Sequence, residues 1–271
     1  MICLIPMAGR GNRFFQEAYR VPKPFIPIMG NPMFITALKS FPPADKYIFI
    51  CRKDFNQYQL KNIVDSLVEN SQVILLDEVT QGQACTCLLA ESQLDPREGL
   101  FIASCDYQTV YDKEKYARLS ADKNVDVIIW TFKIGAIKKA NPNAFAYCVT
   151  DGDRVLEVVE KRTISDTPQL DPAVVGSFTY RTSELFVRGA KQMIEKNIRV
   201  NNEFYVGTSI NQLIEEGYNV VSFEVGKFIS FGNSFELQAV QYWQDYFDHL
   251  EEHPYSSNSV PSIHRVHYHG A

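Results

Sequence analysis

The sequence predicts an α/β fold, with a mostly parallel, Rossmann-like central sheet, a small antiparallel insertion and a C-terminal helix. Two observations predict this fold class. In the first half of the chain, short apolar runs that suit buried strands alternate with stretches of helical periodicity. After Asn141 the apolar runs follow one another more closely, with the spacing of a β-hairpin. Alternating strands and helices are typical of a parallel sheet covered on both faces, and such sheets bind ligands beyond the carboxyl ends of their strands.

The expected elements can be placed along the chain. We expect strands at 2–6, 47–51, 73–76, 100–104 and 125–132, separated by helices at 33–40, 58–68, 83–91 and 113–120. The runs 145–150 and 155–160 flank Asp151-Gly152, a dipeptide that favours a tight hairpin turn. A strand at 174–180, helices at 183–196 and 208–216, and a strand at 220–225 follow.

The last helix has a recognisable start. Asn233 can cap it, and Glu236, three residues later, can reach back as in a capping box. We expect the helix to run to about Glu252, because Pro254 and a serine-rich stretch follow. This leaves residues 254–271 as a tail with three histidines, which we interpret as incidental.

Composition excludes several classes of function. The 271 residues carry a formal net charge of −5, so no general field attracts a polyanion and nucleic acid is not expected as a partner. No stretch approaches the roughly 18 apolar residues of a membrane helix, and the N-terminus lacks the features of a signal peptide. We therefore expect a cytoplasmic protein with no membrane partner. The six cysteines show no paired metal-ligand spacing and suit buried thiols of a reducing compartment.

A glycine-containing basic loop follows the first strand. In Met7-Ala8-Gly9-Arg10-Gly11-Asn12-Arg13-Phe14, two glycines allow a tight turn whose amides can face a phosphate chain. Arg10, Arg13 and the later Lys23 supply neutralising cations. Phe14 occupies the place of the third glycine of a dinucleotide fingerprint, and no Gly-Lys-Ser/Thr is present. An ordinary strand-to-helix turn is the alternative, but the added cations favour a nucleoside triphosphate.

Two further positions suit the same ligand. Asp106 follows the buried run 100–105, where a carboxylate could bind Mg²⁺ or simply cap the next helix. Gln81-Gly82-Gln83 opens a helix after a strand; Gly82 would let a base approach the backbone, and either amide could read a base edge. The alternative is that Gly82 and Gln83 merely begin the helix.

These motifs resemble those of the sugar-phosphate nucleotidylyltransferases, in particular the enzymes of capsule and surface-polysaccharide pathways. The family pattern G-G-x-G-[ST]-R-[LFM] followed by P-K-P is matched by Ala8 to Phe14 and by Pro22-Lys23-Pro24, with Ala8 and Asn12 as substitutions. The resemblance implies a GT-A-like nucleotidyltransferase fold. It also implies nucleotide binding by Met7, Ala8, Gly9, Arg10, Gly11, Asn12, Gln81, Gly82 and Gln83, and catalysis by Arg13, Lys23 and Asp106 with Asp106 holding Mg²⁺.

The resemblance also implies an acceptor side. Glu160-Lys161 is similar to the family's E-K, in which Glu160 would bind hydroxyl groups and the catalytic Lys161 the acceptor phosphate. A cross-strand ion pair on a solvated hairpin is the alternative. Gly176 lies in the family's later glycine-containing strand, and Glu203 lies in an E-[FY]-Y segment. Glu203 could contact the acceptor, or could only favour the start of the next helix.

One position departs from the family pattern. W-x-D-x-G-T, whose aspartate is a second metal ligand, corresponds here to the stretch from Phe228 to Asn233, so Ser230 stands where the carboxylate would be. A hydroxyl is a poor substitute for a charged ligand. Either another group such as Glu203 helps, or Asp106 and the phosphates hold the metal, or activity is reduced.

The sequence thus predicts an enzyme that joins a nucleoside triphosphate to a phosphorylated acceptor, such as a sugar 1-phosphate, and releases pyrophosphate. We expect one domain over 1–253, with a nucleotide-binding half at 1–135, an acceptor-binding half at 136–232 and a C-terminal helix at 233–253. A homodimer is the default assembly. A glycosyltransferase that consumes a nucleotide-sugar and a non-catalytic nucleotide or sugar-phosphate sensor remain as alternatives.

Overall fold

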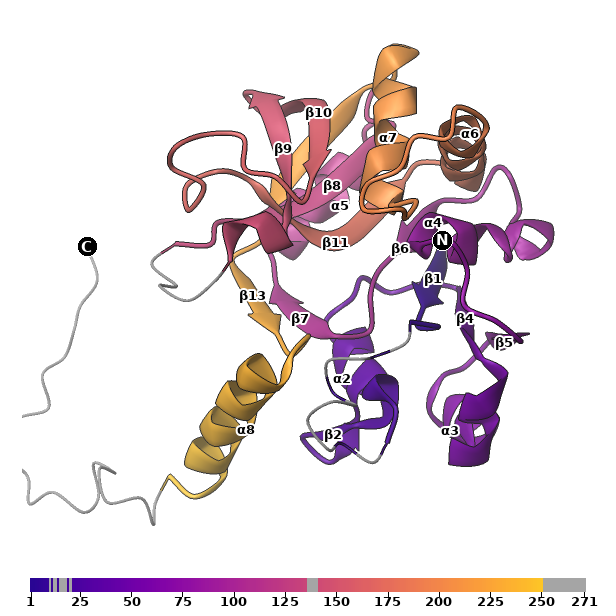
Figure 1. Cartoon of the computed structure of the whole chain (residues 1–271), viewed down its shortest axis with the longest axis vertical. Helices are drawn as coiled ribbons and strands as arrows, with labels where there is room; N and C mark the ends of the chain where they lie inside the picture. Colours follow the sequence, from indigo (N-terminus) through magenta and orange to yellow (C-terminus); the bar gives the residue numbers. More distant parts are fainter. Residues whose placement is uncertain (10, 12–13, 15–18, 20, 136–140, 251–271) are drawn as a thin grey trace, which may run out of the picture.

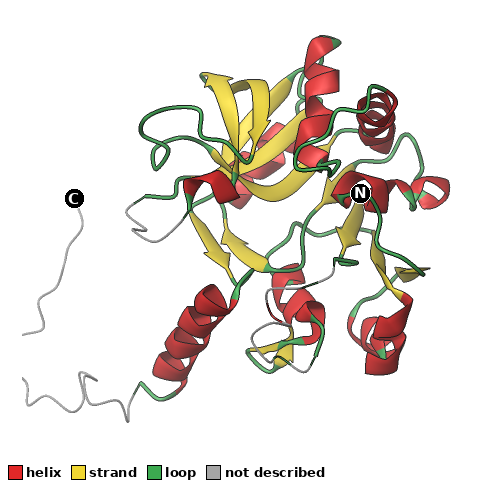
Figure 2. Cartoon of the chain, in the orientation of Figure 1, coloured by secondary structure: helices red, strands yellow, loops and turns green. Residues whose placement is uncertain are grey.

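The structure, a computed structural model, describes residues 1–9, 11, 14, 19, 21–135 and 141–250 (Figure 1). Within these residues one sheet runs in the order β5-β4-β1-β6-β11-β8-β12-β10-β9. Its strands are β1 (Ile2–Pro6), β4 (Lys46–Arg52), β5 (Ser71–Leu76), β6 (Leu100–Ile102), β8 (Val127–Phe132), β9 (Ala146–Asp151), β10 (Arg154–Glu160), β11 (Ala173–Tyr180) and β12 (Val220–Glu224). The arrows in Figure 2 show this sheet as the centre of the molecule.

Two small sheets and several helices complete the described chain. The small sheets pair β2 (Pro27–Ile28) with β3 (Asn31–Pro32), and β7 (Tyr107–Val110) with β13 (Lys227–Ser230). The α-helices are α2 (Met33–Leu38), α3 (Leu60–Leu67), α4 (Gln83–Leu88), α5 (Lys113–Ala121), α6 (Ser183–Glu195), α7 (Val206–Glu215) and α8 (Ser234–Asp248). The 3₁₀ helices are η1 (Lys23–Phe25), η2 (Lys53–Tyr58), η3 (Glu91–Gln93) and η4 (Pro142–Ala144).

The predicted α/β fold class is confirmed, and strand direction divides the sheet into two parts. Strands β5, β4, β1 and β6 are parallel to one another, and β8 and β12 form a second parallel pair. Strand β11 lies between the two groups and is antiparallel to both β6 and β8. The hairpin expected around Asp151-Gly152 is β9 and β10, which extends the same sheet at its far edge.

Both faces of the sheet are buried, which explains why the central strands are continuously apolar. In β1, Cys3 and Ile5 belong to the core on one face, whereas Ile2 and Leu4 belong to the core on the other. The first core takes its helical side chains from α2, α3, α5 and α8, and the second takes them from α4, α6 and α7. Successive side chains of a strand point to opposite faces, so a strand covered on both sides must be apolar throughout.

The C-terminal helix begins as predicted but ends earlier. The side chain of Asn233 accepts a hydrogen bond from the backbone N–H of Glu236 at 2.9 Å. The carboxylate of Glu236 does not reach back as a capping box would, and instead accepts a hydrogen bond from the Ser230 hydroxyl at 2.7 Å. Helix α8 ends at Asp248 instead of near Glu252, and the histidine-containing tail lies outside the described residues.

Two other expectations can be checked on the described chain. None of its helices is long and apolar enough to span a membrane. All six cysteines are free thiols, and all but Cys85 are buried. For Cys51 and Cys148, burial raises the thiol pKa to about 12, so both stay protonated at neutral pH.

Candidate functional site

A pocket of about 810 Å³ opens beyond the carboxyl ends of β1 and β6, at the edge where the parallel strands end. One wall is the chain that follows these strands, and the opposite wall is formed by the start of α4 and the segment before α7. Ten of the predicted site residues line it: Met7, Ala8, Gly9, Gly11, Lys23, Gln81, Gly82, Gln83, Asp106 and Glu203. The fold thus brings the expected nucleotide-side residues of the described chain to one cavity.

Six predicted residues are not placed there. Arg10, Asn12 and Arg13 lie outside the described residues. Glu160, Lys161 and Gly176 are described but do not line this pocket.

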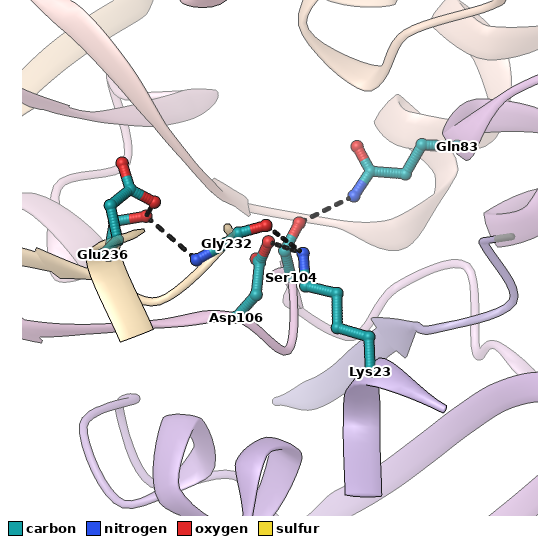
Figure 3. A network of polar contacts seen from close by, with 7 residues as sticks. Lys23, Gln83, Ser104, Asp106, Gly232 and Glu236 are labelled. Atoms are coloured by element: carbon teal, nitrogen blue, oxygen red, sulfur yellow. Dashed lines mark hydrogen bonds and ion pairs between the residues drawn. The ribbon is translucent and has the colours of Figure 1, made fainter. Parts of the chain in front are cut away.

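An ion pair links Lys23 and Asp106 inside the pocket. Lys23 is the first residue of η1, and its Nζ forms an ion pair with Oδ2 of Asp106 and donates to the carbonyl of Gly232 at 3.2 Å (Figure 3). The two side chains are only 21% and 25% exposed, so their attraction is less screened than that of a surface pair. Asp106 does not cap the following helix, because the cap of α5 is Asp112, whose side chain accepts from the N–H of Lys115.

The two-stranded sheet of β7 and β13, which we did not predict, places residues 230–232 beside Asp106. Ser230 pairs with Tyr107, and the N–H of Phe231 donates to the carbonyl of Asp106 at 3.0 Å. This brings Gly232 so close that an added Cβ would lie 3.0 Å from Asp106 Oδ2. Both strands are short, and their pairing depends on residues about 120 positions apart, so no local pattern announces it.

The residues around Asp106 fit a divalent cation that is shared with phosphates. No cluster of three or more His, Cys, Asp or Glu side chains suited to a metal is found in the described part of the chain. Mg²⁺ usually needs only one or two carboxylates, with waters and substrate phosphates as its other ligands. Asp106 supplies a carboxylate, and the cradle at Gly232, which a Cβ would fill, leaves space for a ligand beside it. Ser230, by contrast, directs its hydroxyl to Glu236.

Gly82 joins the two segments that form the opposite wall. It has φ +133°, and an added Cβ would lie 2.5 Å from both the backbone N and O of Phe204. The N–H of Phe204 donates to the carbonyl of Gln81 at 2.9 Å, and the N–H of Ala84 donates to the carbonyl of Phe204 at 3.0 Å. The close approach that Gly82 allows is thus to the backbone of Phe204.

Both glutamines of this loop have partners that the sequence did not indicate. Nε2 of Gln83 donates to the hydroxyl of Ser104 at 3.1 Å (Figure 3). Oε1 of Gln81 accepts from Nη2 of Arg199 at 2.5 Å. Ser104 and Arg199 are far from the glutamines in sequence, and neither lies in a motif that would have marked it.

Glu160, the last residue of β10, and Lys161, which follows it, are the two residues predicted for the acceptor, and they differ in environment. Burial raises the pKa of Glu160 to about 7, although Lys161 opposes the shift. A Cβ added to Gly207, at the start of α7, would lie 2.6 Å from Oε1 of Glu160, so the carboxyl group rests on a position without a side chain. Nζ of Lys161 donates to the carbonyl of Ala144, and within the described residues no ion pair joins Glu160 and Lys161. Among the described residues neither of them has an ion-pair partner, and Glu160 faces Ala146 on the neighbouring strand, so the alternative of a cross-strand ion pair is not found there.

Tyr205 connects these residues to the pocket. It lines the cavity together with Glu203, and Nζ of Lys161 lies 5.7 Å from its ring centroid. Burial and the neighbouring Glu203 raise the pKa of Tyr205, so its phenol stays protonated. Gly176, with φ +99°, would place a Cβ 3.7 Å from the Ser104 hydroxyl. Lys161 and Gly176 therefore lie next to pocket-lining residues without lining the pocket themselves.

Comparison with known proteins supports the fold. No protein-family model matches the sequence, and no curated protein matches it. A nucleoside-diphosphate-sugar pyrophosphorylase from Vibrio cholerae RC9 has a similar structure, with a TM-score of 0.73 and 21% identity over 89% of this chain and 100% of that chain. An inositol-1-phosphate CTP transferase from T. maritima matches with a TM-score of 0.69 and 13% identity, over 90% of this chain and 94% of that chain.

A third solved structure, a UDP-glucose pyrophosphorylase complexed with UDP-glucose, matches with a TM-score of 0.68 and 15% identity, over 90% of this chain and 98% of that chain. At these identities the similarity establishes the architecture and not the reaction. The chain thus has the α/β nucleotidyltransferase fold of the pyrophosphorylases.

Proposed function

We propose that this protein is a nucleotidylyltransferase that transfers the nucleotidyl group of a nucleoside triphosphate to a phosphorylated acceptor and releases pyrophosphate. The observation that carries the proposal is the pairing of Lys23 with Asp106 in the pocket beyond β1 and β6, next to the glycine loop. A cation and a carboxylate at the carboxyl edge of a parallel sheet suit the binding and charge neutralisation of a triphosphate.

The proposed reaction is an in-line displacement. An oxygen of the acceptor phosphate attacks the α-phosphorus, the bond from the α-phosphorus to the bridging oxygen breaks, and its electron pair leaves with pyrophosphate. Lys23 would contact the phosphate oxygens on which negative charge accumulates. Asp106 orients the ammonium group of Lys23 and would hold Mg²⁺, which neutralises phosphate charge when bound.

The nucleotide side would be formed by the glycine loop and the start of α4. We assign phosphate contacts to the backbone of Met7, Ala8, Gly9 and Gly11 and to the undescribed Arg10, Asn12 and Arg13. We assign the base to Gln81, Gly82 and Gln83, on the opposite wall. This side corresponds to the half of the chain before residue 136.

The acceptor side would be formed by the later half. Glu203 and Tyr205 line the pocket, and Lys161 lies against Tyr205. We assign the acceptor phosphate to Lys161, and its hydroxyl groups to Glu160, Glu203 and the strand that contains Gly176. A sugar 1-phosphate has both a phosphate and several hydroxyls, so we propose a sugar 1-phosphate as acceptor and a role in surface-polysaccharide precursor synthesis. A homodimer and a cytoplasmic location remain parts of this proposal.

A pyrophosphate-release screen tests the proposal. Four ribonucleoside triphosphates and dTTP would be incubated with sugar 1-phosphates and other phosphorylated acceptors, with and without Mg²⁺. We expect release that requires one acceptor class and Mg²⁺ and that is lost in Asp106→Asn. Release of a nucleoside diphosphate from a nucleotide-sugar, without pyrophosphate, would instead indicate the glycosyltransferase alternative.

A second candidate function, a non-catalytic sensor of nucleotides or sugar phosphates, is favoured by Ser230. The Ser230 hydroxyl donates a hydrogen bond to Glu236. Position 230 therefore supplies no second carboxylate for a metal beside Asp106. Calorimetry would distinguish the two functions. Tight triphosphate binding with no turnover over the whole acceptor panel would favour the sensor.

A further inference from the structure

Gln81 can present only one end of its amide to the pocket. Its Oε1 accepts from Nη2 of Arg199 at 2.5 Å. A guanidinium has donors and no acceptor, so the amide oxygen must face Arg199 and the amide cannot be flipped. Among the described residues the Nε2 group of Gln81 has no hydrogen-bond partner, although Gln81 lines the cavity. The NH₂ group is therefore what Gln81 has to offer a ligand.

Arg199 is fixed at all three of its nitrogens. Besides Gln81, its Nε donates to Oδ1 of Asn197 at 2.7 Å and its Nη1 donates to the carbonyl of Asn202 at 3.3 Å. The guanidinium carbon lies 4.0 Å from the ring centroid of the buried Phe204, a distance typical of stacking. A side chain with these partners has little freedom to release the oxygen of Gln81.

The segment that carries these partners belongs to the pocket wall. Val200 and Glu203 exchange backbone hydrogen bonds of 3.1 and 2.9 Å around Asn201 and Asn202, which have φ of +48° and +63°. Asparagine tolerates positive φ, so the pair suits this tight turn. Both asparagines line the cavity, and Phe204 ties the segment to Gln81 and Ala84 through the backbone. Arg199 is thus held to the same wall as the residue that it orients.

We propose that Arg199 is a positioning residue for nucleobase recognition, which holds the amide of Gln81 as a hydrogen-bond donor toward the base. The site would then take a nucleoside triphosphate whose base directs an acceptor, a carbonyl oxygen or an unprotonated ring nitrogen, at Gln81. This inference rests on the proposed function. Its consequence is that Arg199, which does not itself line the pocket, sets base preference without taking part in phosphate chemistry.

The test measures how much the base contributes to binding. Calorimetry on the full chain with Mg²⁺ gives the Kd of ATP, GTP, CTP, UTP and ribose 5-triphosphate. The ratio of the Kd of ribose 5-triphosphate to that of the tightest nucleotide reports the contribution of the base. We expect Arg199→Met, which keeps an unbranched apolar stem against Phe204, to lower this ratio by roughly 5-fold, as the loss of one oriented hydrogen bond would.

Further variants separate positioning from structure. Gln81→Glu keeps an acceptor for Arg199 but loses the donor, so we expect it to lower the ratio on the order of 10-fold. Arg199→Lys should retain part of the ratio, because it retains one donor. Gln81→Ala should lower the ratio little further when it is added to Arg199→Met, because the two residues act as a unit. Arg188→Met, which removes an exposed arginine paired with Glu216, is the matched control and should leave the ratio unchanged.

Three results would count against the inference, and they can be told apart. If the wild type binds nucleotides more tightly than ribose 5-triphosphate and Arg199→Met keeps that ratio with an unchanged thermal midpoint, Arg199 does not position Gln81. If the wild type binds no triphosphate at all, the proposed function fails and the inference fails with it. A kcat that falls in Arg199→Met at saturating nucleotide would also count against a role confined to the base.

Discussion

The two sides of the pocket are built by different means. On the side of the glycine loop, Lys23 is directed at Asp106 and Gly232, and the wall opposite is joined by backbone hydrogen bonds between Gln81, Ala84 and Phe204. On the proposed acceptor side, Lys161 donates to a backbone carbonyl, and Glu160 is partly buried against the start of α7. Lys23, Asp106, Gly232 and Gln81 line the cavity in this structure, whereas Glu160 and Lys161 do not.

The difference shows which part of the site needs a ligand to be completed. The proposed nucleotide side is held by contacts between secondary structure elements that do not depend on a ligand to bridge them. Lys161 would have to exchange the carbonyl of Ala144 for an acceptor phosphate. We therefore expect substitutions on the nucleotide side to reduce turnover or folding strongly, and substitutions on the acceptor side to have smaller effects on acceptor affinity.

The largest effect is expected for Lys23→Ala. It removes the cation that is paired with Asp106, and we expect the rate of pyrophosphate release to fall roughly 10²-fold or more, as the loss of a transition-state charge contact does. Steady-state kinetics at saturating substrates measure this. Lys53→Ala, which breaks an exposed ion pair with Asp77, is the control and should act as wild type. A near-normal rate in Lys23→Ala would remove Lys23 from the mechanism.

The second largest effect is expected for Gly82→Ala, because Gly82 lies where the start of α4 contacts the segment before α7. Gly82→Ala would force a Cβ to within 2.5 Å of the Phe204 backbone at φ +133°, so we expect it to lower the free energy of unfolding by about 3 kcal/mol. Gly152→Ala is the matched control, because Gly152 also has positive φ, +60°, but meets nothing within 4 Å. Its cost should be only about 1 kcal/mol. Equal losses in chemical denaturation would show that the contact with Phe204 contributes nothing.

Much of the fold could be predicted because buried strands and tight turns have characteristic residue patterns within short stretches of sequence. The central strands are apolar on both faces, and Asp151-Gly152 announces its own hairpin, so both were readable from short windows. Strand β11 was located but not its antiparallel direction, because direction depends on neighbours far away in sequence. The pairing of β7 with β13 was missed for the same reason.

The candidate site was predictable where a residue of suitable chemistry stands next to a sequence pattern that also determines the local backbone. Lys23 and Asp106 were identified separately, one beside a glycine loop and one after a buried strand, and the structure brings them together. Arg199 and Ser104 were not identified. Folding makes them the hydrogen-bond partners of Gln81 and Gln83, and an isolated arginine or serine carries no signal of that kind.

A third prediction concerns the pH dependence of stability on the acceptor side. Burial raises the pKa of Glu160 from 4.5 to about 7, so between these values the folded state keeps a proton that the unfolded state has lost. Stability from this group should therefore fall as pH rises from about 4.5 to about 7 and then stay constant.

Glu160→Gln tests this sign. Because the neutral amide has no charge to bury, the variant should gain about 2 kcal/mol over wild type at pH 8 and little at pH 4. Urea denaturation at both pH values measures the difference. Glu157→Gln, at an exposed position on the same strand, should show no such change. A wild type whose stability rises over this pH range relative to Glu160→Gln would contradict a raised pKa.

The smallest effect is expected for Lys161→Met. Lys161 must leave the carbonyl of Ala144 before it can bind the acceptor phosphate. The net gain from its contact with the phosphate is therefore the difference between these two interactions. We expect its loss to raise the acceptor KM about 10-fold. The Kd of the nucleoside triphosphate should not change, since Lys161 does not line the nucleotide pocket. Lys133→Met, which removes an exposed lysine paired with Glu224, is the control. A fall in triphosphate affinity would mean that Lys161 belongs to the nucleotide side, and that the two sides of the pocket are not separate in function.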